Sequence, residues 1–462
     1  MLFHSTRGND SGRKFSEIVM QGLASDGGLF IPDAWPQIKI EDLQESDSFL
    51  DVAKKVVPLF TSSSYSEEET VTILENTWHD FDHKDFVSIK SLNSELLVLE
   101  LFHGPTAAFK DFGLQLAAAF FNNILEKEQK TAVVLGATSG DTGSAAIDAC
   151  KKYSRIKSFI LLPNGNMSEV QRRQMTTVDQ SNVFTLKVNG TFDDCQDIVK
   201  SAFRDQDFMN EDQYLLAVNS INWVRIIGQI CYYFYTYAQL KDKHNKLSFS
   251  VPTGNFGNVF ACYSAFKMGL PLEKIIVAVN ENDILYRFFE ENNYSKGSVT
   301  ETISPSMDIS IASNFERLIY DFYSNRDAKV CNDLFNNFPT SSIQLNEDVW
   351  SKSNEIFTSV RINDQDTLAA MSETFNAYHY TIDPHTAVGF QAAQLLKDVL
   401  DSAIVILSTA HPAKFPETLK SAGLNINNIP NSLSSVMDKE EYLFNCEADQ
   451  STIIDYIKQN NL

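Results

Sequence analysis

The chain has 462 residues, of which 43% are hydrophobic and 21% charged, enough at about 150 residues per domain for two or three domains with sizeable cores. Its 60 Asp and Glu residues outnumber its 38 Lys and Arg residues, so the formal net charge is −22. A polyanion repels phosphate on average, which argues against nucleic-acid and anionic-membrane binding. Composition alone therefore favours cationic or neutral ligands.

The six cysteines are scattered and contain no CxxC pair, which argues against a zinc knuckle and against a disulfide framework. No run reaches the roughly 18 apolar residues that a membrane span needs. The first residues lack the charged and apolar regions of a signal peptide. We expect a cytoplasmic protein with no metal site and no nucleic-acid or membrane partner.

Residues 1–95 are expected to form a mainly helical N-terminal subdomain. Residues 32–48 are polar and contain two prolines, which suits a surface connection. Ser66 and Glu69 then have the spacing of a capping box, directly before a segment with apolar residues. This spacing predicts that a helix begins here.

From about residue 95 onward, short apolar runs alternate with segments of helical length. The runs are residues 132–135, 158–162, 183–186, 247–251, 275–279 and 404–407. Continuously apolar strands separated by helices indicate parallel sheets that are buried on both faces. The pattern predicts an α/β fold.

Two loops that contain glycine follow predicted strands, in a chain with only 19 glycines. Residues 136–144 (GATSGDTGS) place small hydroxyl side chains and backbone N–H groups where a helix begins, a setting that can hold a phosphate or carboxylate. Residues 251–258 (VPTGNFGN) repeat the arrangement. The first loop is not a P-loop, because Asp141 stands where that motif needs lysine. For each loop taken alone, an ordinary strand-to-helix turn is the alternative.

Lys110 lies in an apolar stretch, residues 101–111 (LFHGPTAAFKD). A lysine in this setting either extends to solvent or is desolvated with a lowered pKa, and the second state is what a Schiff-base lysine needs. One lysine together with two anion-binding loops suits pyridoxal phosphate. The lysine would bind the cofactor, one loop its phosphate and the other the substrate carboxylate.

These segments, in this order, resemble the threonine synthase family of fold-type II pyridoxal-phosphate enzymes. The resemblance extends from residues 5–8 (STRG) and 21–32 to residues 383–388 (DPHTAV) and 409–415 (TAHPAKF). Ala107, where many relatives have leucine, is a conservative departure. The resemblance implies two open twisted-sheet α/β domains with the cofactor between them. The expected boundaries are 1–95 for the N-terminal subdomain, 96–110 with 236–462 for the large cofactor-binding domain, and 111–235 for a smaller, mobile domain.

The resemblance also implies roles for individual residues. Lys110 would bind pyridoxal 5′-phosphate covalently and move protons, and Thr409 would offer its hydroxyl to the pyridine nitrogen. The expected cofactor contacts are Lys110, Asp141, Gly254, Asn255, Phe256, Gly257, Asn258 and Thr409. The expected substrate contacts are His103, Thr138, Ser139, Thr142, Asn222, Arg225 and Lys414. Of these, His103, Arg225 and Lys414 are the candidate seats for the substrate phosphate, and the protonation state of Asp141 is open. His385 is expected to be structural.

The implied reaction converts O-phospho-L-homoserine and water to L-threonine and phosphate, by γ-elimination and β-addition of water. Two alternatives stay open. One is a phospho-lyase that releases 2-oxobutyrate, like the threonine-synthase-like proteins of animals, and the other is a noncatalytic phosphometabolite-binding protein. A monomer or homodimer is expected. Because the implied ligands are anions, Lys110, Lys414, Arg225 and two helix N-termini would have to reverse the negative field locally.

Overall fold

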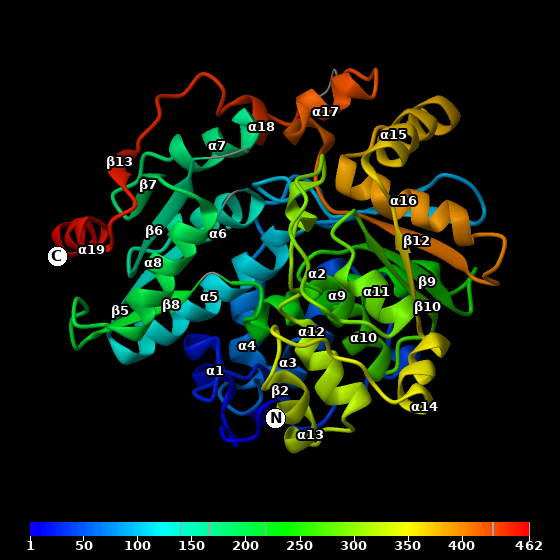
Figure 1. The fold of residues 1–462 in the computed structure, drawn as a ribbon, viewed down its shortest axis with the longest axis horizontal. Helices are drawn as coiled ribbons and strands as arrows, with labels where there is room; N and C mark the ends of the chain where they lie inside the picture. Colours follow the sequence, from blue (N-terminus) through cyan, green and yellow to red (C-terminus); the bar gives the residue numbers. More distant parts are fainter. Residues whose placement is uncertain (139, 165–166, 218, 427–428, 462) are drawn as a thin grey trace.

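The computed structural model describes residues 1–138, 140–164, 167–217, 219–426 and 429–461, and it contains two mainly parallel sheets in neighbouring domains (Figure 1). The strand order of the large sheet is β11-β10-β9-β12-β4-β3, and that of the small sheet is β13-β7-β6-β5-β8. Within these sheets all neighbours run parallel except β3, which pairs antiparallel with β4. The large-sheet strands are β3 (Ser88–Ser91), β4 (Leu96–Glu100), β9 (Leu247–Pro252), β10 (Leu272–Val279), β11 (Phe357–Arg361) and β12 (Ala403–Ser408). The small-sheet strands are β5 (Thr131–Ala137), β6 (Ile156–Pro163), β7 (Val183–Asn189), β8 (Gln213–Ala217) and β13 (Phe444–Glu447).

Helices flank both sheets. Those of the small domain are α5 (Lys110–Glu128), α6 (Asp141–Lys151), α7 (Glu169–Thr176), α8 (Phe192–Arg204) and α19 (Gln450–Asn460). Those that follow in the large domain are α9 (Trp223–Leu240), α10 (Gly257–Lys267), α11 (Ile284–Glu291), α12 (Phe315–Leu318), α13 (Ala328–Phe335), α14 (Glu347–Trp350), α15 (Asp364–Tyr378), α16 (Pro384–Leu396) and α17 (Pro416–Ser421). Helix α18 (Asn431–Ser434) contributes Leu433 to an apolar cluster with Val170 of α7 and with Ala413. All six apolar runs expected to be strands are strands.

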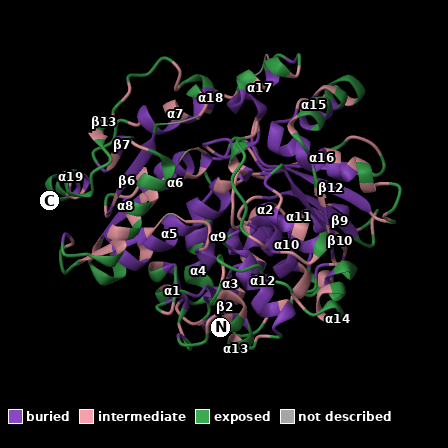
Figure 2. Ribbon diagram, viewed as in Figure 1, coloured by how far each residue is buried: buried purple, intermediate pink, exposed green. Residues whose placement is uncertain are grey.

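The large sheet is buried on both faces because its central strands are apolar at successive positions. In β12, Val405 and Leu407 pack into the main apolar cluster, while Ile404 and Ile406 pack on the opposite face with α16. Successive strand residues point to opposite faces, so a run without polar residues supplies both cores. Figure 2 shows the resulting buried interior of the large domain.

The N-terminal subdomain contains the antiparallel pair β1 (Phe3–Ser5) and β2 (Phe30–Pro32) and four helices, α1 (Phe15–Gln21), α2 (Phe49–Val56), α3 (Pro58–Thr61) and α4 (Glu67–Glu75). The predicted capping box is confirmed at α4. The Ser66 hydroxyl accepts from the Glu69 backbone N–H at 3.1 Å, and the Glu69 carboxylate accepts from the Ser66 N–H at 2.9 Å. No helix in the described parts of the chain is long and apolar enough to cross a membrane.

The C-terminal segment departs from the predicted domain boundaries. Residues 236–462 are expected in the large domain, yet β13 pairs with β7 and extends the small sheet. Ile453 and Ile457 of α19 are fully buried in the small-domain core. The segment lies here because β7 would otherwise be an open sheet edge above an uncovered apolar face. Because the C-terminal segment is acidic, its sequence does not indicate that it completes the small sheet and its core.

Two glycines let helices α5 and α9 cross with their backbones in contact. A Cβ atom at Gly113 would lie 2.9 Å from both Cα and the carbonyl oxygen of Arg225, and one at Gly228 would lie 2.9 Å from the Phe112 carbonyl oxygen. These distances are shorter than any side chain could accept without a backbone shift. The crossing therefore places Arg225 beside the first turn of α5, where Lys110 lies.

Candidate active site

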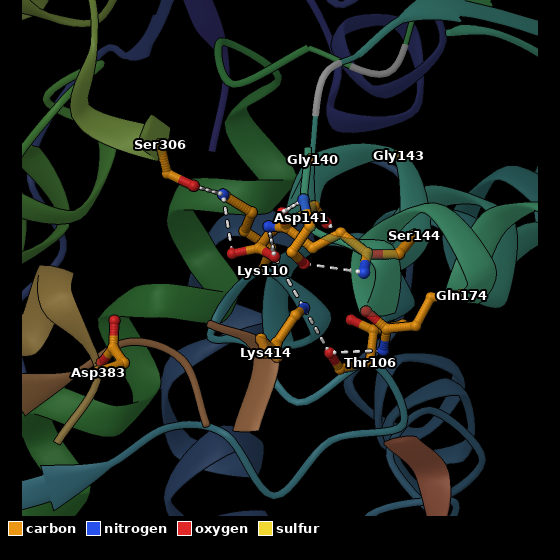
Figure 3. A network of polar contacts seen from close by, with 12 residues as sticks. Thr106, Lys110, Gly140, Asp141, Gly143, Ser144, Gln174, Ser306, Asp383 and Lys414 are labelled. Atoms are coloured by element: carbon orange, nitrogen blue, oxygen red, sulfur yellow. Dashed lines mark hydrogen bonds and ion pairs between the residues drawn. The ribbon is translucent and has the colours of Figure 1, made fainter. Parts of the chain in front are cut away.

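Lys110 begins α5, and its side chain is only 12% exposed (Figure 3). Its Nζ donates to the Ser306 hydroxyl at 3.3 Å and lies 3.6 Å from Asp141 Oδ2. Burial lowers the pKa of Lys110; the Asp141 carboxylate opposes this shift, while the charges of Lys414 and Arg225 add to it. Lys110 thus has the desolvated surroundings that suit a reactive amine.

Asp141 is the first residue of α6 and is held by three donors. Lys414 Nζ lies 2.7 Å from Asp141 Oδ1, the Gln171 amide donates to the same oxygen at 2.8 Å, and Lys110 lies near the other oxygen. Burial acts to raise the pKa of Asp141, but Lys414 and Lys110 outweigh burial and hold that pKa far below its usual value. Asp141 is therefore an ionised carboxylate, which answers a question that its sequence position leaves open.

Lys414 is fully buried in the short turn η5 (Pro412–Lys414). Besides its ion pair with Asp141, it donates to the Thr106 carbonyl oxygen at 2.7 Å, and that oxygen also accepts from the Gln174 amide at 3.0 Å. Figure 3 shows this continuous path from Gln174 through Thr106 and Lys414 to Asp141. Lys414 and Lys110 both pair with Asp141, so Lys414 lies close enough to Lys110 for its expected role as a seat of the substrate phosphate.

Arg225 brings a third cation to this region, from the first turn of α9. Its side chain is buried, and within the described part of the chain its Nε and Nη1 have no hydrogen-bond partner. Burial lowers the pKa of Arg225 to about 10. A buried guanidinium with no counter-ion among the described residues is costly, and an anionic ligand would offset that cost.

The second glycine loop joins β9 to the N-terminus of α10. Phe256, just before the helix, has a left-handed backbone (φ 64°). Among the described residues, none accepts a hydrogen bond from the backbone N–H of Gly254, Asn255 or Phe256. A Cβ atom at Gly254 would lie 2.9 Å from the Ser306 carbonyl oxygen, so only glycine fits against that turn. Free N–H groups at a helix N-terminus form a phosphate cradle.

Asn258, in the first turn of α10, is held from one side only. Its Oδ1 accepts hydrogen bonds from the hydroxyls of Tyr232 and Tyr233, the latter at 2.7 Å, whereas its buried Nδ2 has no partner in the described structure. Both tyrosines are buried residues of α9. They orient the Asn258 amide so that its donor is left for a ligand. The loop and Asn258 together fit the phosphate of pyridoxal 5′-phosphate.

Thr409 follows strand β12 and is linked by backbone to the lysine segment. Its carbonyl oxygen accepts from the N–H of Phe109, next to Lys110, at 2.9 Å. Its own N–H donates to the Thr386 hydroxyl at 3.2 Å. The parallel sheet thus brings residue 409 beside residue 110, at the carboxyl end of the strands, where ligands bind in α/β folds.

Other predicted substrate contacts have partners within the protein. His103 Nε2 lies 3.0 Å from the Glu100 carboxylate. The Thr138 hydroxyl accepts from the Gly143 backbone N–H at 3.1 Å and so shapes the first glycine loop. Asn222 caps α9, with its oxygen accepting from Val224 N–H at 3.1 Å and its amide donating to the Val19 carbonyl at 2.9 Å. Thr142 lies half-buried on α6, and Ser139 lies outside the described residues.

Two polar residues of the cluster have no counterpart among the predicted site residues. Ser306 lies in the short turn η2 (Pro305–Met307), far from any motif, and contacts Lys110. Gln171 lies on α7 and contacts Asp141. The only sequence signal for Gln171 is the spacing Ser168 to Gln171, which indicates a capping box and does not indicate a site.

Comparisons with known proteins agree with this geometry. The family model "Pyridoxal-phosphate dependent enzyme" matches residues 86–331, and models of the threonine synthase N terminus and C-terminal region match residues 2–78 and 386–457. The chain is 42% identical to the threonine synthase of Pseudomonas aeruginosa, over 96% of this chain and 94% of that relative. It is 34% identical to human threonine synthase-like 2, over 92% of this chain and 90% of that relative.

The structure is similar to that of threonine synthase with bound pyridoxal phosphate from Brucella melitensis. The TM-score is 0.94 at 38% identity, and the match covers 100% of this chain and 99% of that one. This confirms the predicted fold-type II architecture and the predicted cofactor. The chain belongs to the threonine synthase family of pyridoxal-phosphate-dependent enzymes.

Proposed function

We propose that this chain converts O-phospho-L-homoserine and water to L-threonine and inorganic phosphate. The observation that carries the proposal is the group of three cations, Lys110, Lys414 and Arg225, of which only the two lysines pair with the carboxylate of Asp141. Inside a protein of net charge −22, this group makes the site locally positive. Such a site suits a substrate that carries a phosphate as well as a carboxylate.

The residues divide into those for the cofactor and those for the substrate. Lys110 would hold pyridoxal 5′-phosphate covalently, residues 254–258 would bind its phosphate, and Thr409 would face its pyridine nitrogen. When bound, the cofactor withdraws electrons and so acidifies the C–H bonds of the substrate amino acid. A hydroxyl partner at the pyridine nitrogen, unlike a carboxylate, does not favour a protonated ring, which moderates this withdrawal.

Lys110 is the residue proposed to move protons. Its lowered pKa favours the neutral amine over the ammonium, so that Nζ can accept the proton from Cα. Asp141, 3.6 Å away, would stabilise the ammonium that results. Over the whole reaction the Cγ–O bond breaks and Cγ gains a proton, while Cβ loses a proton and gains the hydroxyl of water. The remaining proton of water leaves with the phosphate. The free guanidinium of Arg225 is the proposed seat of the phosphate that leaves.

The alternative is a phospho-lyase that releases 2-oxobutyrate, and the similarity to human threonine synthase-like 2 is the observation that keeps it open. Product analysis separates the two. Purified enzyme given O-phospho-L-homoserine should release threonine and phosphate in equal amounts, and Lys110→Ala protein, folded but unable to bind the cofactor covalently, should release neither. Formation of 2-oxobutyrate without threonine would contradict the proposed function.

Several expectations from the sequence remain proposals. These are action in the cytoplasm, a monomeric or homodimeric state, and substrate contacts by His103, Thr138, Ser139, Thr142 and Asn222. The oligomeric state is tested by sedimentation equilibrium, since one chain has a mass of 52.0 kDa. A mass above that of two chains would contradict it.

A further inference from the structure

His385, the second residue of α16, is buried and has a defined tautomer. Its Nδ1 lies 2.9 Å from Asp383 Oδ1, and its Nε2 lies 3.1 Å from the backbone nitrogen of Ser306. A backbone N–H can only donate, so Nε2 must accept and carries no proton. The imidazole is therefore neutral, with its one proton on Nδ1 and donated to Asp383.

Asp383 holds this orientation as the N-cap of α16. Its fully buried carboxylate accepts from the backbone N–H of His385 at 3.0 Å, from that of Thr386 at 3.3 Å and from the Thr386 hydroxyl. These bonds, with the bond from His385 Nδ1, fix both carboxylate oxygens. Asp383 therefore sets the direction of the imidazole without touching Lys110.

Ser306 connects His385 to the cofactor site at two points. Its hydroxyl accepts from Lys110 Nζ at 3.3 Å, and its carbonyl oxygen lies where a Cβ atom at Gly254 would be only 2.9 Å away. The turn that contains Ser306 thus contacts both the amine of Lys110 and the second glycine loop. The bond from Ser306 N–H to His385 Nε2 anchors this turn to α16.

We propose that His385 is a positioning residue, which Asp383 orients and which holds the Ser306 turn against Lys110 and the Gly254 loop. Packing alone does not explain why a histidine stands at position 385. The His385 ring lies 5.0 Å from the Phe415 ring, a contact that leucine could also make, but leucine would leave the Ser306 N–H without its acceptor. The inference rests on the proposed function only in that Lys110 is taken as the reactive amine.

Two substitutions distinguish the role of Nε2 of the His385 ring from the role of Nδ1. In His385→Gln the amide reaches the place of Nε2 and offers an oxygen to the Ser306 N–H. In His385→Asn the shorter amide reaches only the place of Nδ1, so the bond to Asp383 survives and the acceptor for Ser306 is lost. His379→Asn is the matched control, because His379 is exposed and ends α15 in a left-handed conformation that asparagine tolerates.

The measurement is the dissociation constant of pyridoxal 5′-phosphate from the full-length protein, with the visible absorbance of the lysine-bound cofactor. We expect His385→Asn and Ser306→Ala each to weaken binding about tenfold and to shift that absorbance, and His385→Gln to stay within about threefold of the parent. Because both losses act through one turn, the double variant His385→Asn/Ser306→Ala should weaken binding by less than the product of the single effects. His379→Asn should change nothing.

Three outcomes would overturn the proposal: independent effects in the double variant, equal loss in the Gln and Asn variants, or no loss in either. If His385→Asn does not fold, the Gln variant decides, since a loss of about tenfold there would show that an acceptor at Nε2 is not what matters. The binding assay contains no substrate. A product other than threonine would therefore refute the proposed function and leave this inference standing.

Discussion

The Arg225 guanidinium lies inside the protein with two of its nitrogens unpaired within the described structure, and this has opposite consequences for stability and for binding. Without ligand, an uncompensated buried charge destabilises the fold. We expect Arg225→Met to raise the free energy of unfolding of the ligand-free protein by about 1–3 kcal/mol, measured by urea denaturation. The same variant should raise KM for O-phospho-L-homoserine more than tenfold while changing cofactor affinity far less.

Arg204→Met serves as the control, because Arg204 is exposed at the end of α8. It should alter neither stability nor KM. An Arg225→Met enzyme with an unchanged KM would show that the substrate phosphate binds elsewhere, and His103 and Lys414 would then be the candidates.

Asp111, beside Lys110, makes the stability of the fold depend on pH. Burial, with a contribution from nearby Asp148, raises the pKa of Asp111 to about 7. Between about pH 4 and pH 7 the folded protein therefore holds a proton that the unfolded chain releases, so stability from this group falls as pH rises through that window and is lost above it. In Asp111→Asn, urea midpoints should fall less between about pH 5 and pH 8 than in the parent. Parallel curves for the two proteins would contradict the assignment.

At the scale of elements, the crossing of α5 and α9 depends on glycine. Gly113→Ala would gain about 1 kcal/mol of helix propensity, but its Cβ would meet backbone atoms of Arg225 at 2.9 Å. Overpacking against backbone costs about 1–3 kcal/mol, and the backbone cannot rotate away, so destabilisation should win. Gly297→Ala is the control, since its nearest neighbour would be a side-chain atom 3.8 Å away. Thermal unfolding checks both; a Gly113→Ala protein as stable as the control would show that the helices can separate.

Of the five described strands in the two larger sheets that the sequence does not predict, four lie at sheet edges. The fifth, β4, lies between β12 and β3 and is buried throughout. The six predicted runs became β5, β6, β7, β9, β10 and β12, none of which is a sheet edge. The edge strands β3, β8, β11 and β13 carry no such run, since exposed or half-buried residues interrupt their apolar pattern. A continuous apolar run signals burial on both sides, and an edge strand lacks that burial.

The site residues that the sequence predicts also differ from those that it misses, because the former stand in local sequence motifs and the latter reach the site only through folding. Lys110, Asp141 and the 254–258 loop each stand in a short motif whose chemistry can be read from neighbouring residues. Ser306 lies 196 residues from Lys110, and nothing around it marks a site. The ionised state of Asp141 could not be predicted either, because it depends on Lys414 and Gln171, which only folding brings to it.

For the whole molecule, the charge of −22 acts mainly on stability. Excess negative charge repels itself across the surface, and raising the ionic strength from about 0.01 M to about 0.1 M shortens the screening length from about 30 Å to about 10 Å. Surface ion pairs that salt weakens contribute only about 0–1 kcal/mol each. We therefore expect the midpoint of thermal unfolding to rise with sodium chloride over this range. A falling midpoint would mean that attractive surface pairs outweigh the net repulsion.

The chain passes between the two sheets three times, through α5, through α9 and through the segment between β12 and β13. Strand β13 therefore leaves a ribosome long after β7, the strand with which it pairs in the described small sheet. Until then β7 presents an open edge and the small-domain core lacks Ile453 and Ile457. Between the synthesis of β7 and that of β13, an emerging chain of this kind is exposed to edge-to-edge association. The small domain is therefore completed only once β13 and α19 have been made, long after its other strands.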